Sequence, residues 1–122
     1  MALEEAKLAK YRLAWQKRET ERRQALVERG ARARQAASSA AHILRERFGA
    51  RRVRLFGSLL YPETFHQRSD IDLAAEGIEP RRVLKAWCAI SADAPEFVFD
   101  LVTPDECRQV IWDSVELEGV EL

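Results

Sequence analysis

Hydrophobic and polar residues follow a helical period in the first part of the chain. Residues 2–29 consist mainly of strong helix formers, and Leu8, Tyr11 and Trp15 recur along one stripe at i, i+3 and i+7. Residues 31–48 keep the helical period but present a face of small residues, chiefly alanine, which allows close packing. Gly30, between the two segments, predicts a break or kink. The pattern therefore predicts two consecutive helices.

After Gly49, which we expect to cap the second helix, the pattern changes to short apolar runs. Residues 53–56, 70–75 and 97–102 are such runs, and their length and alternation predict three β-strands. Pro80 opens a further helix at its first position. We expect the inward face of that helix to consist of four apolar residues: Val83, Leu84, Trp87 and Ile90.

A last helix is expected after the third strand. The stretch Thr103–Glu106 (TPDE) has the residues of a capping box, with proline at the first helical position. We expect this helix to run to about Leu117 and to bury Val110, Ile111 and Val115. Helices that alternate with a few strands in a chain of 122 residues predict one α/β domain around a small sheet.

The first helix has too thin an apolar stripe to bury much surface by itself. We expect it to lie on another helix, which could belong to the same chain, to a partner protein or to a second copy. We therefore divide the chain into a helical arm, residues 1–30, and a domain, residues 31–122. Charge is also divided, because residues 1–50 carry +6 and residues 51–122 carry −6. The basic half suits an acidic protein or nucleic acid, or a solvated helix face, and nucleic acid is not favoured.

Composition excludes several classes of protein. No apolar run approaches the roughly 20 residues that a membrane-spanning helix needs. The N-terminal residues lack the apolar centre of a secretory signal peptide, so we expect a soluble cytoplasmic protein with no membrane contact. Cys88 and Cys107 do not have the spacing of a metal site, and we expect them to be reduced thiols.

The candidate chemistry lies between Gly57 and Asp100. Gly57 and Ser58 directly follow the first strand and offer backbone N–H groups and a hydroxyl, a common way to hold a phosphate. Asp70 and Asp72 point to one face of the second strand, and two such carboxylates repel each other unless a cation lies between them. Ligands that are all oxygen favour Mg²⁺ or Mn²⁺. Asp100 stands among apolar residues, where an unpaired acid would be costly, and we expect the metal site to account for it.

This arrangement resembles the nucleotidyltransferase superfamily of DNA polymerase beta. The stretches Phe56–Ser58 (FGS) and Ser69–Leu73 (SDIDL) look closest to the signature of the minimal nucleotidyltransferases (MNT), and Asp100 supplies the carboxylate of a later strand. The resemblance covers roughly residues 40–122. It implies an α/β fold in which helices pack on a small mixed sheet, here with an extra long N-terminal helix.

The resemblance also implies two groups of site residues. The catalytic and metal-binding group is Asp70, Asp72 and Asp100, with Mg²⁺ or Mn²⁺ as the metal. The nucleotide-binding group is Gly57, Ser58 and Ser69, with ATP as substrate. Many members continue the Gly-Ser with an arginine, whereas this chain has Leu59–Pro62 (LLYP), so that phosphate contact is missing.

MNT proteins are typically paired with HEPN-domain ribonucleases in toxin–antitoxin systems, and some transfer AMP from ATP to the toxin. The resemblance therefore implies a metal-dependent nucleotidyltransferase that moves a nucleotide, AMP in the first instance, to a HEPN toxin. A non-catalytic antitoxin, and an enzyme that modifies an RNA or a small molecule, stay open as alternatives. A homo-oligomer formed through the arm also stays open.

Three side chains near the site have two interpretations each. Arg52 and Arg54 share one face of the first strand and could reach a triphosphate or decorate a strand edge. Trp87 could stack on a base, but we expect it in the core.

Overall fold

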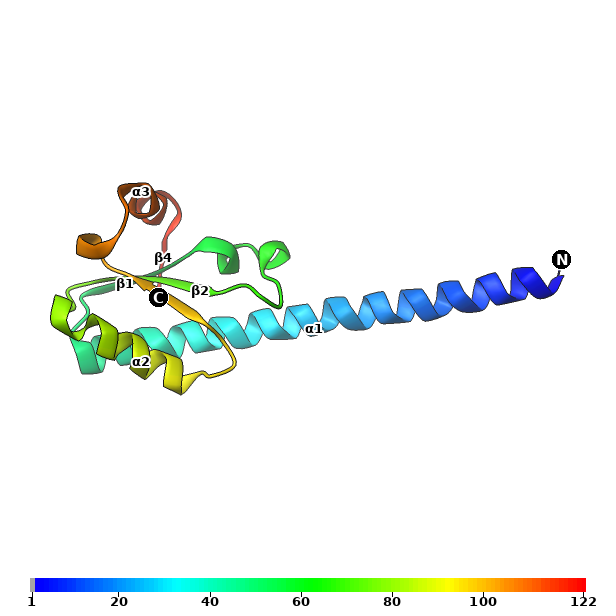
Figure 1. Ribbon diagram of the computed structural model, residues 1–122, viewed down its shortest axis with the longest axis horizontal. Helices are drawn as coiled ribbons and strands as arrows, with labels where there is room; N and C mark the ends of the chain where they lie inside the picture. The colour runs from blue at the N-terminus through cyan, green and yellow to red at the C-terminus, as the bar shows by residue number, and fades with distance from the viewer. Residues whose placement is uncertain (1) are drawn as a thin grey trace.

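The computed structural model describes residues 2–122 as a four-stranded sheet with helices on both faces and a projecting arm (Figure 1). The helices and strands follow the chain in this order: α1 (Ala2–Phe48), β1 (Arg52–Phe56), β2 (Ile71–Glu76), α2 (Val83–Asp93), β3 (Phe99–Val102), α3 (Gln109–Glu118) and β4 (Val120–Glu121). The strand order is β3-β2-β1-β4, with β2 and β3 parallel and the other pairs antiparallel. The mixed α/β fold and the long N-terminal helix that we predicted are confirmed.

The predicted break at Gly30 is wrong, because α1 is one helix of 47 residues that passes through this position. A glycine inside a helix costs about 1 kcal/mol. Two new helix ends would leave up to eight backbone groups to be satisfied elsewhere, and strong helix formers flank Gly30 on both sides. A continuous helix through Gly30 therefore costs less free energy than a break at this residue. Burial along α1 begins at Gly30, and the division of the chain into arm and domain at this residue stays a prediction.

The buried half of α1 packs on one face of the sheet through small side chains. Ala33, Ala37 and Ala40 are fully buried, and they allow the helix to approach β1 and β2 closely. Leu44 and the inward-facing residues of the strands complete this core, which α2 closes from the side (Figure 1). The small-residue face that the sequence predicted is therefore the face that the domain uses.

The inward face of α2 differs from the one we predicted. Ala86 and Ile90 are buried, whereas Leu84 is 72% exposed and Trp87 is 39% exposed. Alanine at the centre of the contact lets α2 lie close to the core, which turns the bulky Leu84 and Trp87 toward its rim.

The last helix is shorter than predicted. Thr103 makes no side-chain capping bond, and a single 3₁₀ turn, Pro104–Glu106, ends before α3 begins at Gln109. Val115 is fully buried as predicted, but Val110 and Ile111 are exposed. α3 instead packs through Trp112 and Val115 on the second face of the sheet.

The loop between β1 and β2 is held against α1. Phe65, in the middle of this loop, is only 2% exposed. The Arg29 guanidinium lies 5.7 Å from the Phe65 ring, and its Nε donates a hydrogen bond to the His66 carbonyl. The loop therefore meets α1 where the arm leaves the domain. From Ala2 to the C-terminus, none of the helices is both long and apolar enough to span a membrane.

Candidate active site

Two of the predicted site acids are neighbours in the sheet. Asp72 of β2 and Asp100 of β3 are partners in the parallel register, so their side chains leave the same face, the one that α3 covers. Asp70 directly precedes β2 and shares that face by alternation. Ile71, between Asp70 and Asp72, is fully buried in the opposite core, which fixes the direction of both carboxylates.

The Gly-Ser turn lies against Asp72. Phe56, the last residue of β1, pairs with Asp72, and Gly57 follows with φ of 76°, in the left-handed region. A Cβ on Gly57 would be 2.1 Å from Oδ2 of Asp72, so only glycine leaves room for this carboxylate. The carbonyl of Ser58 accepts hydrogen bonds from the Tyr61 N–H and the Thr64 hydroxyl. These bonds hold the turn beside the acids.

The three carboxylates share one electrostatic field. Burial, followed by the charges of Asp100 and Asp70, raises the pKa of Asp72 from its ordinary value of 3.8 to about 6. The raised pKa means that the fold makes the ionised form of Asp72 less favourable, because burial and the two neighbouring carboxylates disfavour another negative charge there. A divalent cation bound by oxygen ligands would offset this effect.

Asp70, Asp72 and Asp100 would all bind a metal through carboxylate oxygens, and such ligands suit Mg²⁺ or Mn²⁺. Asp72 is partly buried, and Asp70 and Asp100 are exposed. Within residues 2–122, however, no three His, Cys, Asp or Glu side chains converge closely enough to count as a ready metal cluster. The assignment of these acids as metal ligands stays a prediction.

The expected burial of Asp100 is wrong. β3 is the edge strand of the sheet, and its outer side is open, so Asp100 is exposed although apolar residues surround it in sequence. Because water hydrates this carboxylate, its position carries no burial cost that a metal would have to offset, and a metal-binding role for Asp100 stays a prediction.

A groove adjoins the acids and was missed by sequence reasoning. We call it the acidic groove; its charged members are Asp70, Asp100 and Glu106, and its other lining residues are Pro80, Val83, Leu84, Trp87, Val98, Phe99 and Leu101. Trp87 lies in this groove instead of the core, and its indole Nε1–H donates a 2.7 Å hydrogen bond to the Phe99 carbonyl. The sequence indicates only weakly that Trp87 would line a groove, because a tryptophan at helical spacing is more often buried.

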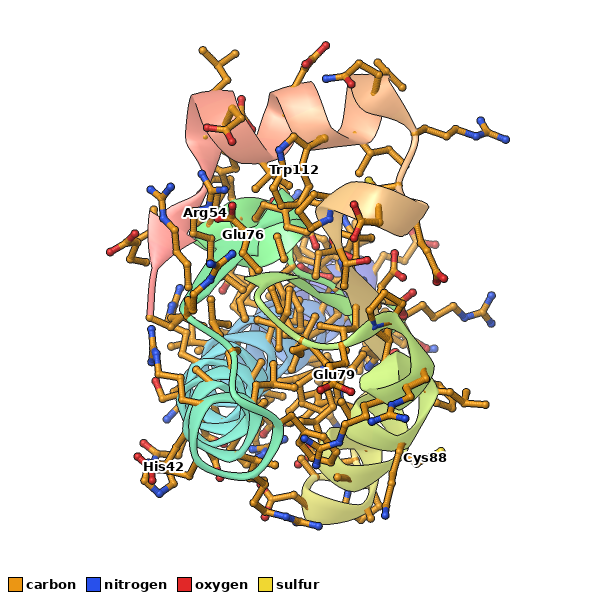
Figure 2. All side chains as sticks on the ribbon, turned by 90° about the vertical axis from the view of Figure 1, so that its left-hand side faces the viewer. His42, Arg54, Glu76, Glu79, Cys88 and Trp112 are labelled. Atoms are coloured by element: carbon orange, nitrogen blue, oxygen red, sulfur yellow. The ribbon has the colours of Figure 1, made fainter. Side chains whose placement is uncertain are left out.

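Arg54 has a structural role that neither interpretation anticipated. It is 2% exposed and lies under α3, where its guanidinium is 3.1 Å from a carboxylate oxygen of Glu76 and 3.4 Å from one of Glu116 (Figure 2). The guanidinium also lies 5.5 Å from the Trp112 ring. Arg54 therefore joins β1, β2 and α3 and does not decorate an edge.

Ser69 is engaged within its own loop. Its hydroxyl accepts a 2.7 Å hydrogen bond from the His66 N–H. This bond shapes the turn before Asp70, and the nucleotide-binding role of Ser69 stays a prediction, as do those of Gly57 and Ser58.

Comparison with known proteins gives structural matches alone: no protein-family model matches the chain, and neither does any curated protein. One solved structure, a mutant of the toxin–antitoxin MntA–HpeT with two aspartate-to-glutamate changes, has a chain 20% identical with a TM-score of 0.59, and the match covers 70% of each chain. The fold is that of the MNT antitoxins.

Two further similar structures contain a nucleotide analogue or an AMPylated protein. A toxin–antitoxin with AMP-PNP is 22% identical with a TM-score of 0.58, and the match covers 70% of each chain. A tri-AMPylated Shewanella oneidensis HEPN toxin in complex with its MNT antitoxin gives 20% identity and a TM-score of 0.55, covering 73% of this chain and 70% of the other. The fold that the Gly-Ser and Asp-x-Asp motifs predicted is confirmed.

Proposed function

We propose that this chain is a nucleotidyltransferase that transfers AMP from ATP to a hydroxyl of a partner protein, as the antitoxin of a HEPN toxin. The observation that carries the proposal is the register of Asp72 and Asp100, side by side on one face with Asp72 against the Gly57 turn. The MNT structures add support, since one holds AMP-PNP and another a tri-AMPylated toxin. A third has aspartate changes two positions apart, the spacing of Asp70 and Asp72.

The reaction exchanges one phosphorus–oxygen bond for another. The acceptor oxygen forms a bond to the α-phosphorus of ATP, the bond to the bridging oxygen breaks, and pyrophosphate leaves with that electron pair. Asp70, Asp72 and Asp100 would hold the metal ions, which would supply positive charge beside the reacting oxygens. Asp100, on the exposed edge strand, is the acid best placed to accept the proton of an incoming hydroxyl.

The remaining groups act on the triphosphate. The backbone N–H groups of the turn that begins at Gly57 can donate to a phosphate, and the Ser58 hydroxyl can donate a further hydrogen bond. The carboxylate of Asp72 prevents anions from binding at this turn on their own, so triphosphate binding here is tied to the presence of a cation.

A second function is favoured by one observation. The stretch Leu59–Pro62 lacks the arginine that many MNT members place after the Gly-Ser. A chain that grips the triphosphate weakly could act as an antitoxin by binding its toxin without modifying it.

One experiment separates these functions. The protein is incubated with α-³²P-ATP, Mg²⁺ and the purified product of its neighbouring gene, and in parallel with total RNA. We expect label on the partner protein, and we expect Asp72→Asn to abolish it while the circular dichroism spectrum is retained. Asp113→Asn, an exposed change on α3, is the matched control and should keep full activity.

Three other results of the labelling experiment would each contradict the proposal. Label that persists in Asp72→Asn would remove these acids from the mechanism. Label on RNA alone would change the acceptor, and a stable complex without label would leave binding as the function.

A further inference from the structure

The arm exposes three large hydrophobic side chains on one helical face. Leu8, Tyr11 and Trp15 are 56%, 70% and 59% exposed, respectively. Leu8 and Trp15 are seven residues apart, and Trp15 and Leu26 are eleven apart, about two and three helical turns. We call Leu8, Tyr11 and Trp15 the arm face. It continues the side of α1 that packs on the domain, but none of residues 2–122 buries it.

The acidic groove is a second exposed hydrophobic surface. Leu84 and Val98 are 72% and 60% exposed, and Trp87 lines the same groove, fixed by its hydrogen bond to the Phe99 carbonyl. A tryptophan held in one orientation loses little conformational entropy when a partner covers it. The groove is therefore a preformed surface for an apolar or aromatic ligand.

The two surfaces have opposite electrostatic surroundings. Between Lys7 and Arg29 the arm has eight lysines or arginines and three glutamates. The groove is lined by three carboxylates and no basic residue, within a half of the chain that carries −6. Two arms would repel each other, whereas an arm and a groove attract.

The arm cannot reach the groove of its own chain. α1 is one unbroken helix from Ala2 to Phe48, and it projects away from the sheet (Figure 1). A return to the groove would require a break in this helix and loss of several of its hydrogen bonds. The complementary surfaces can therefore meet between two molecules.

We propose that the arm face of one copy docks into the acidic groove of a second copy. The contact joins two different surfaces, so it is a head-to-tail contact. Two copies could exchange arms and form a closed dimer, or each arm could bind a further copy and form a longer assembly. Three apolar side chains on each side make a small interface, and the association is weak and reversible. The arm then covers the approach to Asp70 and Asp100. This contact requires no nucleotide and does not depend on the proposed transfer reaction.

Sedimentation velocity of the purified chain tests this contact without ATP. We expect the weight-average sedimentation coefficient to rise with concentration between about 10 and 500 µM, as a small interface predicts. The rise should weaken at high salt, because the attraction between arm and groove is screened. An arm variant, Tyr11→Ser with Trp15→Ser, and a groove variant, Leu84→Ser with Val98→Ser, should each lose at least about tenfold in association constant. All four side chains are exposed, so both variants should keep the fold.

Mixing the two variants gives the decisive result. The arm variant keeps an intact groove and the groove variant an intact arm, so their mixture should recover association that neither shows alone. Leu117→Ser, 84% exposed on α3 and outside both surfaces, is the matched control and should associate as the wild type. A monomeric wild type, or a groove variant that associates normally, would overturn the proposal; the second result would indicate pairing of arms. Failure here leaves the labelling experiment unaffected.

Discussion

Replacing Asp72 by asparagine should stabilise the metal-free protein while it removes the proposed activity. The carboxylate of Asp72 is partly buried beside Asp70 and Asp100, and its pKa in the fold is about 6 against an ordinary value of 3.8. A raised carboxyl pKa means that folding opposes ionisation. Ionised Asp72 therefore costs stability at neutral pH, and asparagine, of nearly the same shape, removes that cost.

The size of the stability gain in Asp72→Asn, and its dependence on pH, follow from the pKa shift of Asp72. One pKa unit corresponds to about 1.4 kcal/mol, so the shift sets an upper bound of about 3 kcal/mol. Because solvent reaches part of this side chain, we expect about 1 to 2 kcal/mol. Below pH 3.8 Asp72 is protonated in both the folded and the unfolded chain, and the gain vanishes. It should grow as the pH rises from 3.8 to about 6 and stay constant above that.

Urea unfolding followed by circular dichroism, with a chelator present, measures this gain. The free energy of unfolding of Asp72→Asn minus that of the wild type should be near zero at pH 3.5 and about 1 to 2 kcal/mol at pH 8. Asp113→Asn, the same substitution at an exposed position of α3, is measured in parallel as the control. A variant that is less stable than the wild type at pH 8, or a gain of equal size at both pH values, would refute the electrostatic account of the site.

Three further measurements test the site and its support. Adding Mg²⁺ should raise the melting temperature of the wild type but not that of Asp72→Asn, because binding to the folded state stabilises it. Gly57→Ala should cost at least about 2 kcal/mol more than Gly49→Ala in urea unfolding. Both glycines have φ near 75°, but a Cβ meets the Asp72 carboxylate only at Gly57, so equal costs would remove the steric argument. Arg54→Met should lose about 2 kcal/mol or more by the same method, and Arg52→Met, on the exposed surface, less than about 1; the reverse order would contradict the burial of Arg54.

The motifs of this chain could be predicted because they depend on the backbone geometry of residues that are close together in the sequence. Strand alternation alone places Asp70 and Asp72 on one face, and a glycine directly after a strand indicates a tight turn. The later acid, Asp100, also lies on a predicted strand. What the pattern could not supply was the register of β2 against β3, which pairs Asp72 with Asp100 and arises only when the strands assemble.

The errors have a common physical origin in contacts between distant residues. The partners of Arg54 are 22 and 62 residues away, so no local pattern could show that this arginine would be buried and paired with them. The rotation of α2 depends on Ala86 against the core, which turns Trp87 outward. Helical periodicity shows which residues share a face, but when bulky and small residues alternate it does not show which face is covered.

The continuity of α1 gives the small residues of the core a mechanical influence on the arm. About 22 residues separate Leu8 from Gly30, a distance of roughly 33 Å along the axis of a rigid rod. A tilt of about 5° where Ala33 and Ala37 contact the sheet would move Leu8 sideways by roughly 3 Å, close to the width of a methyl group. The alanines are thus the point about which the arm would pivot, and enlarging one of them would change the direction in which its far end points.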